Sequence, residues 1–222
     1  MARTVCKRYA TGGACGRTDL AQAATHAGCA TCIRSAPSPA FVYTQLMRID
    51  VINPNTTAAM TAAIGRAAEA VAAPGTRIVA SQPAFGAPSI EGHHDDVWAA
   101  AGVTAQVRAG QADGADAFVI ACFGDPGLAA ARELATGPVI GIAEAAFHCA
   151  SLLATGFSVV TTLERTCVIA EHLVVQYGFE RRCRGIHGTE IAVLELDDPA
   201  SDAYARILAA SRDALALTLI HI

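Results

Sequence analysis

A cysteine at the end of an apolar run is the residue of this sequence with the clearest capacity for chemistry. Cys122 follows the run Ala117–Ala121 and comes just before the turn Gly124–Gly127. In an α/β protein, the end of a buried strand lies at the sheet edge where ligands bind, and turn N–H groups there stabilise a thiolate. The alternative is simple packing, because free cysteines are among the most buried residues. Cys122 is therefore a candidate reactive thiol.

Strand and helix patterns alternate along the chain from Met47 onward. Short runs rich in Val and Ile predict buried strands, and longer segments with apolar residues at helical spacing predict helices. The expected strands are residues 49–52, 77–80, 117–121, 138–142, 157–160 and 189–193. The first expected helix has Thr56 or Thr57 as its candidate N-cap and ends near residue 72. The next three cover residues 95 to about 110, 128–135 and 144–153. A fifth has Thr161 or Thr162 as its candidate N-cap and ends at residue 177, and a sixth follows the candidate N-cap Ser201.

Repeated β-α units favour right-handed crossovers and parallel sheets, with ligands bound at the carboxyl ends of the strands. Three loops meet this condition, namely Asn53–Thr57, Cys122–Gly127 and Thr161-Thr162. Their N–H groups suit a carboxylate, an imide or another anionic oxygen. No GxGxxG or GxxxxGK[ST] motif follows a strand, so the sequence does not predict a dinucleotide site or a P-loop.

The composition favours a globular α/β protein without a nucleic-acid surface. Hydrophobic residues make up 53% of the 222 residues, yet no apolar segment reaches the 18 or so residues of a membrane helix. Residues 47–222 carry eleven Lys and Arg against nineteen Asp and Glu, whereas phosphate binding depends on clustered basic side chains. We therefore expect a soluble protein that binds neither nucleic acid nor membrane.

Residues 1–46 are predicted to form an irregular N-terminal extension, with a weak organelle-targeting segment and translated upstream sequence as alternatives. Within it, Cys29 and Cys32 have zinc or redox spacing, but no second pair accompanies them.

The run His93-His94-Asp95-Asp96 contains metal-ligand types, but adjacent side chains point apart and acidic residues are ordinary at a helix start. No metal site is predicted. The absence of an apolar secretory stretch favours a cytoplasmic protein with free thiols.

Four short motifs lie in the predicted strand-end loops or beside them. They read VINPNTT at 51–57, GAPSIEG at 86–92, ACFGDPGL at 121–128 and GPVIGIAE at 137–144. Together they resemble the aspartate/glutamate/hydantoin racemase family, and the likeness is closest to hydantoin and allantoin racemases. It extends over residues 47 to about 215.

The resemblance implies two α/β lobes with parallel sheets, over residues 47–141 and 142–217, and an active site in the cleft between them. It also implies racemisation of a 5-substituted hydantoin or allantoin without a cofactor, by one cysteine from each lobe. The hydrogen to be removed lies next to a carbonyl, so its loss leaves an enolate that N–H donors stabilise. One thiolate takes a proton and one thiol returns another from the opposite face. Cys122 matches the first cysteine, and the implied substrate-binding positions are Asn55, Gly86, Ser89, Glu91, Phe123, Gly124, Asp125, Thr161 and Thr162.

The C-terminal sequence departs from the family pattern. The second cysteine is expected in a segment resembling Leu-Gly-Cys-Ala-Gly after the helix that begins at Ser201, but residues 218–222 instead form a tail outside the pattern. We therefore expect an incomplete second lobe and impaired two-thiol chemistry. The alternatives are one-base, decarboxylase-type chemistry at Cys122 and a truncated, non-catalytic remnant. Uncovered apolar surface would favour a homo-oligomer.

Overall fold

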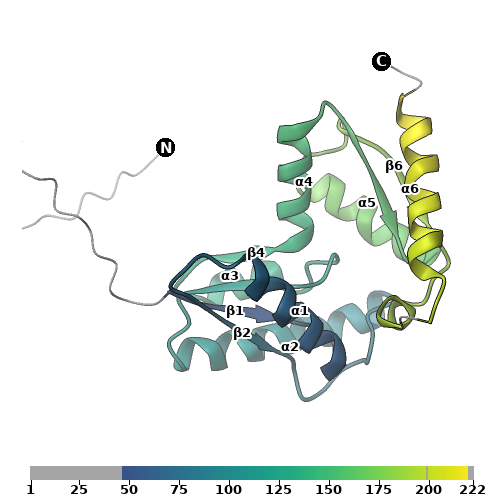
Figure 1. Ribbon diagram of the computed structural model, residues 1–222. Helices are drawn as coiled ribbons and strands as arrows, with labels where there is room; N and C mark the ends of the chain where they lie inside the picture. The colour runs from purple at the N-terminus through teal and green to yellow at the C-terminus, as the bar shows by residue number, and fades with distance from the viewer. Residues whose placement is uncertain (1–46, 199, 220–222) are drawn as a thin grey trace, which may run out of the picture. The chain divides into compact units, whose positions relative to one another are not determined.

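The computed structural model describes residues 47–198 and 200–219, and the extension predicted over residues 1–46 lies outside them. Strands and helices alternate along the described chain, as the sequence pattern predicts (Figure 1). The strands are β1 (Met47–Ile52), β2 (Thr76–Ser81), β3 (Ala117–Ile120), β4 (Val139–Gly141), β5 (Phe157–Thr161) and β6 (Cys183–Gly188). The helices are α1 (Ala58–Val71), α2 (His93–Ala112), α3 (Leu128–Leu134), α4 (Ile142–Leu153), α5 (Cys167–Gln176) and α6 (Ala203–Leu219), with short 3-10 helices η1 (Glu164–Thr166) and η2 (Val193–Asp197).

Four of the strands form a parallel sheet in the order β2-β1-β3-β4. Ile52 at the end of β1 pairs with Ser81 on one side and Ile120 on the other, and Ile120 pairs with Gly141. The carboxyl ends of the four strands therefore lie along one edge. Ile52 and Ile120 have no exposed surface, as expected for a parallel sheet covered on both faces. The predicted α/β fold with parallel strands is confirmed.

Helix α2 packs closely against this sheet because it presents small residues to it. A methyl group added at Gly110 would collide with the side chains of Asp50 and Phe118. One and two turns earlier along the same face, Val107 and Val103 are fully buried in the core of the sheet. This close packing fixes the position of the first turn of α2, which reaches the edge where the strands end.

The second sheet contains β5 and β6, which are also parallel. The strand predicted at residues 189–193 is wrong, because the pairing partner of β5 is the preceding segment Cys183–Gly188. Two glycines and an arginine in that segment hid its strand character from the sequence pattern. After β6 the chain turns away at Glu190, whose φ is 51°, and Ile191 enters the core as a fully buried side chain.

An aromatic cluster fills the space between α4 and the second sheet. The Phe147 ring of α4 is buried, and its centroid lies 5.2 to 6.2 Å from those of Phe123, Phe157, Tyr177 and Phe179. Most of these contacts are edge-to-face, the arrangement that aromatic quadrupoles favour. Because Phe123 belongs to the loop after β3, this cluster connects that loop to the core of the second sheet.

Two predicted helix starts have different outcomes. The helix expected from Thr161 or Thr162 is wrong at its beginning, because η1 intervenes and α5 starts at Cys167. The start at Ser201 is confirmed, since the Ser201 hydroxyl oxygen accepts the Ala203 N–H at 3.0 Å. Helix α6 then runs alongside β5 and β6 (Figure 1). None of the helices in the described residues has the length and apolar content that crossing a membrane requires.

Candidate active site

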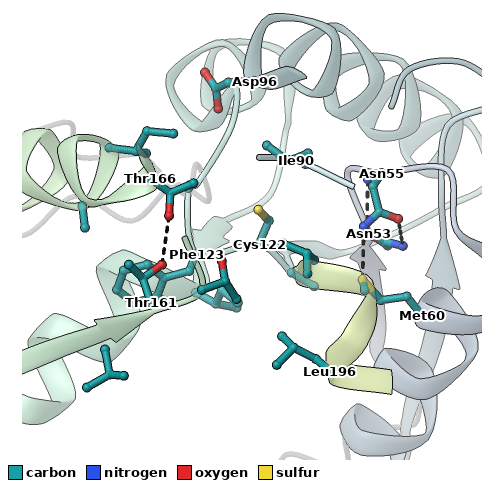
Figure 2. Close-up of a pocket in the computed structure, with 18 of the residues that line it drawn as sticks. Asn53, Asn55, Met60, Ile90, Asp96, Cys122, Phe123, Thr161, Thr166 and Leu196 are labelled. Carbon is teal, nitrogen blue, oxygen red and sulfur yellow. Dashed lines mark hydrogen bonds between the residues drawn. The ribbon is translucent and has the colours of Figure 1, made fainter. Parts of the chain in front are cut away.

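A cavity of about 400 Å³ opens at the carboxyl ends of β1, β3 and β5 (Figure 2). Its volume lies in the range of small-molecule sites. Loops that follow the three strands form part of its wall, and the rest comes from α1, α2, α4, α5, α6, the two 3-10 helices and the loop after β2. The lining residues are Asn53, Asn55, Met60, Ile90, Asp96, Ala121, Cys122, Phe123, Gly124, Ile142, Val160, Thr161, Thr162, Thr166, Ile169, Ala170, Val193, Leu196 and Ile207.

The thiol of Cys122 lies in this cavity, near the middle of the side chains drawn in Figure 2. The turn after the strand is closed by the Asp125 N–H, which donates to the Cys122 carbonyl at 3.0 Å. Burial raises the pKa of the Cys122 thiol to about 11, and the charges of Asp125 and Asp96 act in the same direction. A backbone hydrogen bond from Gly124 opposes them. The turn N–H thus favours the thiolate as the sequence suggested, but burial outweighs it and Cys122 is a thiol at neutral pH.

Asn55 is held at the cavity by a small buried network that the sequence did not predict. Asn53 donates through Nδ2 to Asn55 Oδ1 at 2.7 Å and to Thr61 Oγ1 at 2.9 Å. Asn55 Oδ1 also accepts the Thr57 N–H at 2.9 Å, and Asn55 Nδ2 donates to Met60 Sδ at 3.1 Å. These bonds occupy the Asn55 carbonyl oxygen and one amide hydrogen. They leave the second amide hydrogen for a ligand oxygen.

Asp125 lies under the Cys122 loop and does not line the cavity. Its carboxylate accepts the N–H groups of Ala143 at 3.0 Å and Glu144 at 2.9 Å, and the hydroxyl of Tyr177 at 2.9 Å. Burial raises the pKa of Asp125, while these three hydrogen bonds lower it. The side chain caps the start of α4 from the neighbouring loop, which ties the Cys122 loop to α4 and α5.

Gly86, Ser89 and Glu91 also lie outside the cavity wall. Gly86 has a φ of 116°, a conformation that favours glycine in this loop. Glu91 forms an ion pair with Arg165 at 2.6 Å and accepts the Ser89 hydroxyl at 3.1 Å and the Val193 N–H at 3.3 Å. Glu91 therefore connects the loop after β2 to η1 and to the start of η2, beside the cavity.

The remaining predicted positions lie in the wall. Phe123 and Gly124 line the cavity directly after Cys122, and Thr161 and Thr162 line it at the end of β5. The Thr161 and Thr166 hydroxyls are 3.3 Å apart. Since Thr166 donates its hydroxyl hydrogen to the Leu163 carbonyl at 2.7 Å, Thr161 is the donor between them, and its oxygen can accept from a ligand.

Several lining residues were not predicted from the sequence. Asp96 was considered as a member of a run with metal-ligand types and as an acidic residue at a helix start, and Asn53 as part of a turn, but neither was predicted to line a substrate cavity. Met60, Leu196 and Ile207 come from segments whose apolar spacing indicates burial without indicating a cavity. The described residues contain no group of three or more His, Cys, Asp or Glu side chains placed to hold a metal ion.

The sequence profile of the Asp/Glu/hydantoin racemase family matches residues 49–218. The chain belongs to this family. The hydantoin racemase of Pseudomonas sp. (strain NS671) is 49% identical over 154 residues, which are 69% of this racemase-family chain and 62% of that protein. The structure of an allantoin racemase from Klebsiella pneumoniae superposes with a TM-score of 0.75 at 58% identity, covering 76% of this chain and 69% of that one.

A second allantoin racemase structure, from Pseudomonas fluorescens, superposes with a TM-score of 0.71 at 40% identity, covering 74% of this chain and 70% of that one. The two-sheet arrangement is therefore the fold of this racemase family. The chain spans 62% and 63% of the lengths of two hydantoin racemases that it matches.

Proposed function

We propose that the protein has the racemase chemistry of its family on a neutral cyclic ureide, such as a 5-substituted hydantoin or allantoin, and that this chain by itself carries out the half of that reaction in which Cys122 exchanges the proton on one face of the stereogenic carbon. The observation that carries the proposal is the position of the Cys122 thiol in a cavity at the carboxyl ends of the strands. Family membership and the relatives named hydantoin and allantoin racemases support the substrate class.

The other polar groups of the cavity suit the same chemistry. Removing the hydrogen next to a carbonyl moves negative charge onto the carbonyl oxygen, and a fixed N–H donor lowers the energy of that enolate. The free amide hydrogen of Asn55 is such a donor, because Asn53, Thr57 and Met60 hold the rest of the side chain in place. Most of the other lining side chains are apolar, and a hydrogen bond to the enolate is stronger beside apolar groups than in water.

Inversion needs one group that removes a proton and another that returns a proton to the opposite face. The family resemblance assigns these roles to two thiols. Among the cysteines of the described residues, Cys149 is exposed, Cys167 is buried in α5 and Cys183 starts β6, and Cys122 is the one that lines the cavity. We therefore propose that this chain, acting alone, exchanges the proton from the Cys122 face only.

Hydrogen exchange at the substrate carbon tests the proposal. The purified chain is incubated in D2O with each enantiomer of a 5-substituted hydantoin, with deuterium incorporation followed by NMR and optical rotation in parallel. We expect incorporation into one enantiomer with retention, rising with pH because the Cys122 pKa is raised to about 11, and no incorporation above background for Cys122→Ser.

Three outcomes would contradict this scheme. Rapid loss of optical activity that survives Cys122→Ser would remove Cys122 from the reaction. No exchange by a folded chain would remove the activity altogether. Release of carbon dioxide from a substituted malonate, with no exchange into the hydantoin, would support the one-base decarboxylase instead.

A further inference from the structure

The cavity around Cys122 contains a single charged side chain among its described lining residues. That residue is Asp96, and no Lys, Arg or His lines the wall with it. Within this wall, a ligand that carries a carboxylate would find no cation with which to pair; His93 and His172 line only the neighbouring cavity that Asp96 and Gly124 also border. The ligand would also meet the negative charge of Asp96 in surroundings that screen charge poorly.

Asp96 is positioned by the first turn of α2. Its N–H donates to the Gly92 carbonyl at 3.1 Å, and no hydrogen bond or ion pair to its carboxylate occurs within the described residues. The adjacent Asp95 differs, because its carboxylate accepts the Glu91 N–H at 3.0 Å. Two neighbouring carboxylates thus have separate uses, Asp95 in holding a loop and Asp96 in facing the cavity.

Gly124 leaves open space between the carboxylate of Asp96 and the sulfur of Cys122. A methyl group on Gly124 would lie 3.8 Å from Asp96 Oδ1 and 3.9 Å from Cys122 Sγ. Both groups therefore border the point beside Gly124 where the missing side chain lets a ligand come into contact with the two of them. Asp96 and Gly124 also line a second cavity of about 400 Å³, so a substituent of the ligand has room beyond that point.

The charge of Asp96 acts on the neighbouring titratable groups. Burial raises the pKa of Asp96, and the electrostatic interaction with His93 opposes that change. The charge of Asp96 in turn contributes to the raised pKa of Cys122. The carboxylate and the sulfur are therefore close enough to influence each other across the cavity.

We propose that Asp96 is the residue that selects a neutral, N–H-bearing ring over a carboxylate in the Cys122 cavity. It accepts a hydrogen bond from a ring N–H of the ligand and repels a ligand carboxylate. The proposal rests on the proposed function for the identity of the ring, since a cyclic ureide carries both the N–H groups and the carbonyl that Asn55 would bind.

Alkylation of Cys122 by a neutral and an anionic reagent of similar size tests the charge effect without turnover. Iodoacetamide and iodoacetate react with the same thiolate, so the ratio of their rates cancels the pKa of Cys122 and reports the local field. The rates are measured on the Cys122 peptide by mass spectrometry, for folded and urea-unfolded protein. We expect the ratio of iodoacetate to iodoacetamide to rise about fivefold to tenfold in Asp96→Asn.

The matched control is Asp95→Asn, which makes the same change of charge one residue away. The asparagine oxygen can still accept the Glu91 N–H, and Asp95 does not line the cavity. We expect its alkylation ratio to remain near that of the unsubstituted protein. Equal ratios in Asp96→Asn and in the unsubstituted protein would overturn the proposal, as would a Cys122 that reacts with neither reagent in the folded state.

Protection of Cys122 from iodoacetamide then tests ligand selection. The two ligands are a 5-substituted hydantoin and its ring-opened N-carbamoyl amino acid, which carries a carboxylate and the same side chain. We expect the hydantoin to protect the unsubstituted protein at lower concentration, and Asp96→Asn to reduce or reverse that preference. If these results hold while deuterium exchange is absent, the proposed function fails and the role of Asp96 stands; the opposite pattern removes only the role of Asp96.

Discussion

Replacing Asp125 by Ala should destabilise the protein more than its position in a surface turn would indicate. Asp125 is almost fully buried, and its carboxylate accepts three hydrogen bonds from two backbone N–H groups of α4 and the Tyr177 hydroxyl. The substitution removes the acceptor of all three hydrogen bonds at once and leaves the three donors without a partner. It also places alanine at a φ of 45°, a conformation that aspartate and asparagine tolerate better.

The expected loss of unfolding free energy follows from these contacts. A hydrogen bond to a charged group contributes about 1.5 to 3 kcal/mol, and two of the three bonds are those by which Asp125 caps α4. The left-handed backbone adds about 1 kcal/mol for alanine. Burial of the carboxylate opposes these contributions, so we expect Asp125→Ala to lose about 3 to 4 kcal/mol. Asp125→Asn keeps one acceptor oxygen and tolerates the backbone, and should lose about 1 to 2 kcal/mol.

Urea unfolding followed by circular dichroism measures both variants, with Tyr177→Phe as the control that deletes one of the three donors. We expect Tyr177→Phe to lose about 1 kcal/mol and to have less effect when combined with Asp125→Asn than alone. A loss below 1 kcal/mol for Asp125→Ala would refute the assignment of Asp125 as the cap of α4. So would full additivity of the double variant.

Other predictions concern the cavity and the second core. The rate at which iodoacetamide alkylates Cys122 should rise about tenfold for each pH unit up to about pH 11. The urea-unfolded protein should instead reach a plateau near the usual cysteine pKa of about 8.5. The same low plateau in the folded protein would contradict the argument that burial raises the Cys122 pKa. Gly124→Ala should change the urea midpoint little, because the added methyl meets only atoms at 3.8 to 3.9 Å, yet a hydantoin should no longer protect the thiol from alkylation; retained protection would place the ligand elsewhere. Glu91→Gln removes the ion pair with Arg165 and should change the free energy of unfolding by less than about 1 kcal/mol. It should also raise the hydantoin concentration that protects Cys122 from alkylation. An unchanged concentration would show that the contact between Glu91 and Arg165 does not affect the cavity. Phe147→Ala should lose about 3 to 5 kcal/mol in urea unfolding, and a smaller loss would mean that the four surrounding rings close the space.

The ends of several strands and helices could be predicted from the sequence because they depend on residues that are close together in the chain. The apolar run before Cys122 and the turn after it predicted a strand end, and β3 ends at Ile120. The hydroxyl of Ser201 predicted the start of α6. The helix end predicted at residue 177 agrees with α5, which ends at Gln176 and is followed by Gly178 with a φ of 76°. Each of these depends on neighbours within a few positions along the chain.

Pairing between strands that are distant in the sequence could not be predicted in the same way. β6 has two glycines and little apolar content, so its propensity gave no sign that it would pair with β5. Residues 189–193 look more like a strand, but Glu190 adopts a left-handed conformation and the segment leaves the sheet. Tertiary context overrode local propensity at both places.

The sequence by itself determined that Cys122 would stand at the carboxyl edge of a parallel sheet, because hydrophobic periodicity and turn residues act over short distances. The tertiary structure decided what surrounds the thiol. Asp96 meets the cavity through the packing of α2, and Asp125 faces away from it because α4 and Tyr177 take its carboxylate. The raised pKa of Cys122 has the same origin, since burial and the charges of Asp125 and Asp96 depend on segments that only folding brings together.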